Sequence, residues 1–257
     1  MARRYSLLAE TFDRIGPPLF TLHGSRLVEL AQVSPGERVL DVAAGRGAVL
    51  FAAAERVGSL GQVIGIDLAP EMVRRTAADI EARGLGCVEI RQMDAEALDF
   101  PDASFVCVLC GFGLFFLPHL PKALAEFHRV LRPGGHFGAT TDGPPDERWS
   151  WWQEMRRTHG AEGRVVAQYL EDTREVERAL EEARFVDVRV IEDGFDLAYA
   201  DEEEWWASQY VNMEGTMDPS VLTRLRAAAL EKVRELKRSD GLHRWSRARY
   251  NLARKAA

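Results

Sequence analysis

The sequence predicts an α/β protein whose mostly parallel sheet is covered by helices on both faces. Apolar, strand-like segments alternate with helix-like segments between residues 39 and 141, and acidic side chains stand near the ends of several of these strands. Alternating units of this kind form doubly wound parallel sheets, which bind ligands at the carboxyl ends of their strands. With 257 residues, 46% of them hydrophobic, the chain suits a single α/β domain with a good core.

The first unit is the segment VLDVAAGRGAVL. It joins a buried strand over residues 39–42 to a helix expected at residues 48–57, and Asp41 stands at the carboxyl end of the strand. Between them, Gly45 and Gly47 let the backbone bend sharply and approach a ligand closely. This pattern predicts that the turn faces a nucleotide-like molecule.

The second unit is the segment QVIGIDLAPEMV, which contains an apolar strand ending at Asp67. Pro70 is well placed as the first residue of the next helix. A carboxylate at this point can accept hydrogen bonds from both hydroxyls of a ribose, as the corresponding acid does in dinucleotide-binding folds. Asp67 can also cap the helix, and the two roles are compatible.

Three further strands complete the predicted core. The third runs into Asp94, and the fourth covers residues 105–110. A helix centred on residues 123–131, a turn at 132–135 and a fifth strand at 136–141 follow. Because carboxyl ends of parallel strands lie at one edge of a sheet, the residues at these ends should lie close together. They are Asp41, Asp67, Asp94 and Cys110.

Four motifs in this order carry a resemblance to a known family: DVAAGRG at 41–47, IGIDLAPEM at 64–72, RQMDAEALDFPDASF at 91–105 and EFHRVLRPGGHF at 126–137. The chain resembles the class I S-adenosylmethionine-dependent methyltransferases. Within them it is similar to the branch of ubiquinone and menaquinone biosynthesis enzymes and small-molecule, natural-product methyltransferases. The resemblance implies a Rossmann-like sheet of seven strands, the last one antiparallel, with a helical lid from the amino-terminal segment and the insertions.

The predicted organisation is one methyltransferase domain over residues 1–257. The alternation of Arg247, Arg249 and Asn251 with apolar residues suggests a half-buried last strand at the margin of the sheet. The expected parts are an amino-terminal helical lid at 1–35, a cofactor-binding core at 36–141, substrate-side insertions at 142–172 and 192–242, and the last strand at 243–257.

The resemblance also implies which residues hold the cofactor S-adenosylmethionine. The methionine part is assigned to Asp41, Ala43, Gly45 and Gly47, and the ribose is assigned to Asp67. The adenine is assigned to Leu68, Met72, Asp94 and Ala95, and the sulfonium end is assigned to Cys110. Three residues depart from the family pattern. Ala43 and Arg184 stand where the family commonly has glycine, and Val106 stands where an acid commonly follows the aromatic residue of the fourth strand. No metal is expected.

Large aromatic residues gather in the regions outside the core. Tyr5, Phe12 and Phe20 precede it, three tryptophans open the first insertion, and a further group follows residue 204. Together they could form an apolar lid over a flat or hydrophobic acceptor. The residues predicted to bind substrate are Trp149, Trp152, Trp205, Trp206 and Tyr210. Packing of helices against the sheet is the alternative for each tryptophan.

Methyl transfer is an in-line displacement, so proximity, alignment and exclusion of water supply much of the rate. A hydroxyl or carbon acid also has to lose a proton near the moment of attack, and histidine is best matched to neutral pH. The candidate bases are His159 in the first insertion, then Asp142 after the fifth strand, and His23 in the amino-terminal segment.

Several other classes are disfavoured. Nicotinamide dehydrogenases need a small residue three positions beyond the second glycine, where this chain has Leu50. A net charge of −7 disfavours nucleic acid as a partner. We expect no membrane insertion, because the longest apolar run, residues 105–117, is too short to span a bilayer. Three cysteines without an even framework suit a reducing, cytoplasmic location.

The sequence therefore predicts methyl transfer to a small organic acceptor, with oxygen favoured over carbon or nitrogen, in a natural-product pathway. Two alternatives stay open. One is a cyclase or rearrangement enzyme that keeps the S-adenosylmethionine pocket, and the other is a non-catalytic cofactor-binding partner protein. A homodimer formed through the aromatic lid or the carboxyl-terminal helix is also left open.

Overall fold

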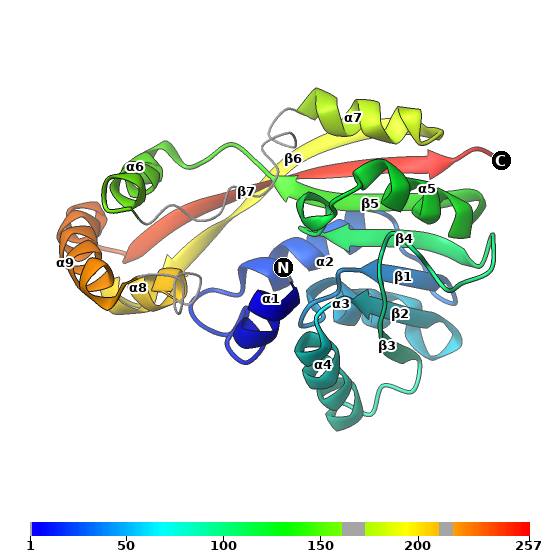
Figure 1. Ribbon diagram of the computed structural model, residues 1–257, viewed down its shortest axis with the longest axis horizontal. Helices are drawn as coiled ribbons and strands as arrows, with labels where there is room; N and C mark the ends of the chain where they lie inside the picture. Colours follow the sequence, from blue (N-terminus) through cyan, green and yellow to red (C-terminus); the bar gives the residue numbers. More distant parts are fainter. Residues whose placement is uncertain (1, 161–172, 211–217) are drawn as a thin grey trace.

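The computed structural model describes residues 2–160, 173–210 and 218–257. Within these ranges, seven strands form one sheet in the order β3-β2-β1-β4-β5-β7-β6 (Figure 1). β7 is antiparallel to both of its neighbours and the other six strands are parallel, which confirms the predicted sheet. The strands are β1 (Arg38–Val42), β2 (Gln62–Asp67), β3 (Val88–Gln92), β4 (Phe105–Gly111), β5 (Leu131–Asp142), β6 (Phe185–Tyr199) and β7 (Leu242–Lys255).

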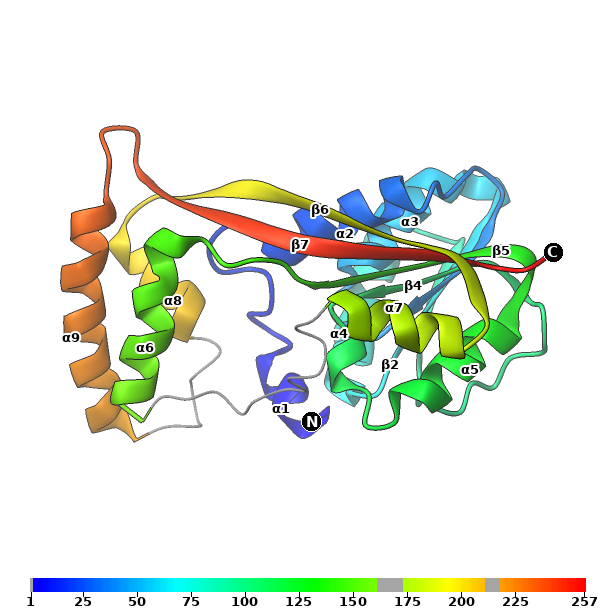
Figure 2. The ribbon, with the colours of Figure 1, turned by 90° about the horizontal axis from the view of Figure 1, so that it is seen from above.

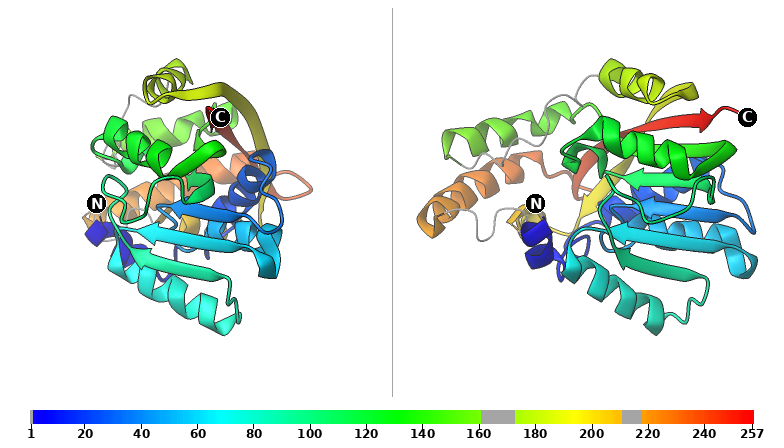
Figure 3. Two further views of the ribbon diagram at one scale, coloured as in Figure 1. Left: turned by 90° about the vertical axis from the view of Figure 1, so that its right-hand side faces the viewer. Right: turned by 45° about the vertical axis from the view of Figure 1, so that its right-hand side comes forward.

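Helices cover the sheet on both faces (Figure 3). One face packs against α2 (Leu19–Leu30) and α3 (Ala48–Val57), and the opposite face packs against α5 (Leu120–Val130) and α7 (Thr173–Glu182). α4 (Pro70–Ala82) begins at Pro70, as predicted from the fixed φ of proline. The short α1 (Ala2–Leu8) and the 3-10 turns η1 (Gly58–Leu60), η2 (Leu114–Phe116) and η3 (Glu147–Trp149) complete this part.

The central strand β4 shows why the core is stable. Its first six residues are buried, as expected for a parallel strand covered on both faces. Cys107 and Cys110 belong to the hydrophobic clusters on opposite faces of the sheet. Their CxxC spacing therefore does not bring the two thiols together, in agreement with the alternation of side chains along a strand.

Two expectations about the strands were wrong. The turn predicted at residues 132–135 lies inside β5, where a register shift between the pairs Phe105–Leu131 and Cys107–His136 accommodates the extra residues as a bulge. The last strand is not at the sheet margin, because β7 lies between β5 and β6. Asn251 is fully buried there, and β6 forms the edge instead.

The antiparallel pair of β6 and β7 extends beyond the rest of the sheet (Figure 2). β5 ends at Asp142, opposite Ala248, whereas β6 and β7 stay paired as far as Tyr199 and Leu242. The insertion predicted from residue 192 therefore begins only after the strand ends. Three helices pack on this distal part of the β6–β7 pair and form what we call the helical lobe: α6 (Ser150–Thr158), α8 (Glu202–Tyr210) and α9 (Pro219–Leu236).

Arg184 replaces the glycine expected at this position, and the end of α7 still adopts the left-handed conformation. Arg184 adopts a φ of +68°, the left-handed conformation that usually favours glycine after a helix, and its backbone N–H donates to the carbonyl of Glu181 at 2.9 Å. α7 therefore ends in the conformation that the family pattern requires. Among the helices of the described ranges, none is long and apolar enough to cross a membrane.

Candidate active site

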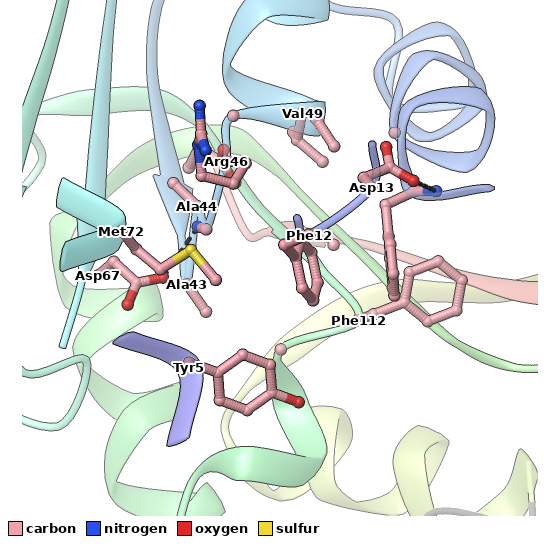
Figure 4. Close-up of a pocket in the computed structure, with 18 of the residues that line it drawn as sticks. Tyr5, Phe12, Asp13, Ala43, Ala44, Arg46, Val49, Asp67, Met72 and Phe112 are labelled. Carbon is pink, nitrogen blue, oxygen red and sulfur yellow. Dashed lines mark hydrogen bonds between the residues drawn. The ribbon is translucent and has the colours of Figure 1, made fainter. Parts of the chain in front are cut away.

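A cavity of about 980 Å³ lies at the carboxyl ends of β1, β2 and β4, beneath the amino-terminal segment, residues 2–30. β1 lies between β2 and β4, so the strand order reverses at this point. Open α/β sheets bind ligands in the crevice at such a switch point. Figure 4 shows residues from the turn after β1, from β2 and α4, and from the amino-terminal segment around the same space.

The glycine turn that follows β1 forms one wall of the cavity. Ala43, Gly45 and Gly47 have φ values of +55°, +52° and +83°, so all three adopt the left-handed region. A Cβ atom at Gly47 would also lie 2.5 Å from the ring of Phe51. The departure at Ala43 preserves the turn, since alanine occupies the glycine-like conformation. One hydrogen bond, from the backbone N–H of Ala44 to the carbonyl oxygen of Ile66 at 2.9 Å, fastens the turn to β2.

Asp67 is held by backbone hydrogen bonds and lines the cavity, and it is not the N-cap of α4, which is Ala69. Its two carboxylate oxygens accept from the backbone N–H of Gly45 and of Ala69, each at 2.8 Å. Burial raises the pKa of Asp67, and these backbone hydrogen bonds oppose the shift. Each oxygen retains a further acceptor position, as a carboxylate that binds ribose hydroxyls requires.

Asp41 is the most unusual acid of the site. It is 1% exposed and lines the cavity, yet within the described part of the chain neither carboxylate oxygen has a hydrogen-bond partner of ordinary geometry. Burial and the nearby Asp67 raise its pKa well above the usual range, opposed by the Leu50 amide. A buried carboxylate without a partner is costly, so a cationic group in the cavity would be favoured. The ammonium of the methionine part of S-adenosylmethionine fits this requirement.

The predicted adenine contacts also lie in the cavity wall. Met72 is 1% exposed, Leu68 is 53% exposed, and both line the cavity with Asp94 and Ala95. One oxygen of Asp94 accepts from the backbone N–H of Glu96 at 2.9 Å, which holds the carboxylate in place. Apolar surfaces beside an acceptor for an exocyclic amine suit an adenine ring.

Cys110 is not among the residues that line the cavity. It is fully buried behind Gly113, where a Cβ atom at residue 113 would lie 2.6 Å from the Cys110 sulfur. Burial raises the pKa of the Cys110 thiol, with the carboxylates of Asp41 and Asp67 adding to the shift. The thiol therefore packs beneath the cavity floor in its neutral form.

Of the three candidate bases, the structure brings Asp142 to the cavity and leaves the two histidines outside its lining. His23 is fully buried, with ring nitrogens 2.7 Å from the Tyr250 hydroxyl and 3.0 Å from the Ser246 hydroxyl. Burial lowers the pKa of His23 to about 4. His159 ends α6 in the helical lobe, where its Nδ1 is 2.9 Å from the Met155 carbonyl oxygen.

The predicted substrate-binding aromatics lie in the helical lobe and not around the cavity. Trp205 is fully buried at the centre of the lobe, and its ring lies 5.3 Å from that of Trp149 and 5.1 Å from that of Trp152. Trp206 is buried beside them and Tyr210 packs against the cluster. In this structure these five residues form the core of the lobe, in line with the packing alternative.

Aromatic residues from two other regions line the cavity instead. Tyr5, Phe12 and Phe20 come from the amino-terminal segment, whose aromatic content the sequence made evident. Phe112, Phe115 and Phe116 follow β4 and are not among the residues predicted from the sequence, where their apolar run bears only on the question of a membrane span. A run of aromatics directly after a ligand-binding strand was the signal that could have identified them.

An ion pair fastens the amino-terminal segment over the cavity. Arg46, from the glycine turn, has a side chain only 7% exposed and bonds to the Asp79 carboxylate and to the carbonyl of Ala9. Arg14 pairs with the same carboxylate at 2.8 Å. Asp79 therefore joins α4, the glycine turn and the amino-terminal segment at one point.

The comparisons with known proteins agree with this geometry. Residues 39–135 match a family model described as a methyltransferase domain. The matched segment includes the glycine turn and the strand ends that line the cavity, so the core of this chain is similar to methyltransferase domains.

Two relatives and one solved structure extend the comparison. The chain is 44% identical over 147 residues to nocamycin O-methyltransferase of Saccharothrix syringae, covering 57% of this chain and 52% of the relative. It is 45% identical over 109 residues to the ubiquinone/menaquinone biosynthesis C-methyltransferase UbiE of Methylococcus capsulatus, covering 42% and 44%. The matches thus span about half the length of these relatives. The YcgJ protein of Bacillus subtilis shares the fold, with a TM-score of 0.63 at 20% identity over 92% of this chain and 99% of that one.

Proposed function

We propose that this protein transfers the methyl group of S-adenosylmethionine to a small organic acceptor. The observation that carries the proposal is the buried carboxylate of Asp41, which faces the cavity without a partner in the described chain. A dinucleotide cofactor offers phosphates to this position, and its negative charge would be repelled by the buried acid. The ammonium of S-adenosylmethionine instead offers the charge and the donors that the carboxylate lacks.

The residues of the cavity have distinct tasks in this scheme. Asp41 orients the methionine end, Asp67 accepts from the ribose hydroxyls, and Asp94 with Met72 holds the adenine. When bound, S-adenosylmethionine supplies a methyl group on positively charged sulfur. The enclosing walls exclude water and align the acceptor for in-line attack, which provides much of the rate.

The acceptor atom forms a bond to the methyl carbon as the carbon–sulfur bond breaks and its electron pair returns to sulfur. A hydroxyl acceptor also releases its proton, for which Asp142 is the candidate acceptor at the end of β5. We favour oxygen as the acceptor atom and natural-product biosynthesis as the setting, since nocamycin O-methyltransferase is among the relatives. The similarity to UbiE, a C-methyltransferase, makes carbon the second candidate.

Calorimetric titration with S-adenosylhomocysteine tests the proposal, with NADH as the control ligand. We expect micromolar binding of S-adenosylhomocysteine, loss of that binding in Asp67→Ala, and no binding of NADH. Asp102→Ala is the matched control, because its carboxylate is 78% exposed and lies outside the cavity lining. A folded wild-type sample that binds no S-adenosylhomocysteine would refute the proposal.

Product analysis then separates the types of chemistry. Incubation of acceptors with S-adenosylmethionine, followed by mass spectrometry, should reveal a mass gain of one methylene unit and equal formation of S-adenosylhomocysteine. A product rearranged without a mass gain would assign the protein to the cyclase alternative. Cofactor binding without conversion of any acceptor in a broad screen would favour the non-catalytic partner.

A further inference from the structure

Six aromatic side chains form a continuous surface in the cavity, which we call the aromatic wall. Phe112 is buried, and the other five are half-buried, with part of each ring left uncovered. The amino-terminal segment and the stretch after β4 each contribute three of them. They are Tyr5, Phe12, Phe20, Phe112, Phe115 and Phe116.

Ring contacts link the members of the aromatic wall. Phe12 and Phe20 stack with their centroids 4.7 Å apart and an interplanar angle of 20°, and Phe20 meets Phe112 edge-on at 5.5 Å. Tyr5 touches Phe12 at 6.0 Å and Phe116 at 5.0 Å, again edge-on. These are the offset and edge-to-face geometries that aromatic rings prefer, so the wall can extend by one more ring of the same kind.

Phe112 is held in place at an energetic cost. Its φ is +52°, a left-handed conformation that is uncommon and strained for a bulky residue. The backbone N–H of Phe112 donates to the buried Thr140 hydroxyl at 2.8 Å, and the ring packs edge-on against His23 at 5.5 Å. Strained residues of this kind concentrate where side chains meet ligands, which supports a binding role for this ring.

The wall begins beside the expected cofactor position. Phe12 and Tyr5 pack against the cluster that contains Met72, one of the predicted adenine contacts. Figure 4 shows the ring of Phe12 between Met72 and Phe112. An acceptor on the wall would therefore share one cavity with the methyl donor.

We propose that the aromatic wall binds a planar aromatic ring of the acceptor, and that Phe12, Phe20 and Phe112 select for planarity. The inference rests on the proposed function and names its substrate class. The half-buried rings of the wall lose contact with water when a flat apolar ligand lies on them. An aromatic ligand also stacks on these rings, which a ligand with a saturated ring cannot do.

A cationic ligand is the competing occupant, because aromatic faces also attract ammonium groups. The neighbouring sulfonium disfavours it. Two like charges in one enclosed cavity repel each other more strongly than they do in water, because the effective dielectric constant there is lower. An uncharged or anionic aromatic ring avoids this repulsion.

Binding of two probes to the wild-type protein tests the planarity. The probes are 2-naphthol and decahydro-2-naphthol, which share a carbon skeleton and one hydroxyl but differ in flatness. With saturating S-adenosylhomocysteine present, calorimetry should give an affinity about tenfold higher for 2-naphthol. Equal affinities or no binding of either probe would overturn the inference. Tighter binding of trimethylphenylammonium than of 2-naphthol, measured with S-adenosylmethionine, which carries the sulfonium, in place of S-adenosylhomocysteine, would also overturn it.

Leucine variants locate the binding surface. Phe12→Leu, Phe20→Leu and Phe112→Leu keep apolar volume but remove the ring, so each should weaken 2-naphthol binding about three- to tenfold and leave decahydro-2-naphthol unaffected. Trp245→Leu removes a 38% exposed ring outside the cavity and should change neither affinity. Variants that fold, as judged by thermal denaturation, and bind 2-naphthol like the wild type would contradict the assignment.

S-adenosylhomocysteine binding separates the two proposals. A protein that binds S-adenosylhomocysteine but shows no preference for 2-naphthol refutes the aromatic subsite and leaves the methyltransferase proposal intact. A folded protein that binds no S-adenosylhomocysteine refutes the proposed function itself. Binding of 2-naphthol can then be measured without the cofactor product, so the aromatic wall is still judged on its own.

Discussion

Replacing Asp41 by asparagine should stabilise the protein and weaken cofactor binding at the same time. Both oxygens of Asp41 are buried without a partner in the described chain, and an unsatisfied buried polar group costs about 1–3 kcal/mol. Removing the charge should recover part of this cost. For a chain of this size, a gain of about 1 kcal/mol raises the melting temperature by roughly 2–4 °C.

The same variant loses a charge-assisted hydrogen bond to the ligand ammonium. Such bonds contribute about 1.5–3 kcal/mol, so S-adenosylhomocysteine should bind roughly 10- to 150-fold more weakly. Differential scanning calorimetry and isothermal titration on the same samples measure the two effects. The stability gain should shrink as the pH falls, because burial raises the pKa of Asp41 and the protonated acid resembles the amide.

Asp13→Asn is the matched control for Asp41→Asn. Asp13 also lines the cavity, but its oxygens accept from the backbone N–H of Phe20 at 3.0 Å and of Thr21 at 2.9 Å. The same chemical change should therefore destabilise the protein there, by about 1–3 kcal/mol. The reasoning is refuted if Asp41→Asn loses stability as Asp13→Asn does, or if it binds S-adenosylhomocysteine as tightly as the wild type.

Three other perturbations have defined outcomes. Gly47→Ala should lower the free energy of unfolding, measured by urea denaturation, by about 2–4 kcal/mol, because the added Cβ clashes with Phe51 and the residue has a positive φ. The control Gly84→Ala also has a positive φ but no atom near the added Cβ, so it should cost only about 1 kcal/mol. Burial lowers the pKa of His23 from 6.5 to about 4, so the unfolded chain takes up this proton first and stability falls as the pH drops through that range. Between pH 6.5 and 5 this loss is about 2 kcal/mol, and denaturation curves of His23→Gln should lack it. Asp79→Asn removes the charged partner of Arg14 and Arg46, so proteolysis within residues 2–14 should become faster and precede cleavage of the core. Mass spectrometry of the fragments measures this rate. Cleavage at the wild-type rate would contradict the role of Asp79 in fastening the segment.

Local sequence patterns were sufficient to predict the secondary structure around the glycine turn. The helix predicted at residues 48–57 coincides with α3, and the strand predicted to end at Asp67 coincides with β2. The reason is that a glycine turn between a buried strand and a helix is specified by residues within a few positions of one another. Asp41, Asp67 and Asp94 then meet in the cavity because parallel strands share one edge.

The acceptor side could not be predicted in the same way. Both the tryptophans of the helical lobe and the phenylalanines after β4 are large apolar residues outside the glycine turn. Composition cannot tell a ring that packs in a core from a ring that lines a cavity, because both bury apolar area. The length of the antiparallel β6–β7 pair decides which rings line the cavity, since this pair carries the helical lobe beyond the end of β5.

The sequence by itself determined the α/β class, the glycine turn and the acids at the strand ends, because each depends on neighbouring residues. The tertiary structure decided the role of His23, which is hydrogen-bonded to Tyr250, 227 positions further along the chain. It also decided the interior position of β7 and the grouping of Phe12 with Phe112 along one wall. Such contacts arise from which elements pack together, and no local spacing records that choice.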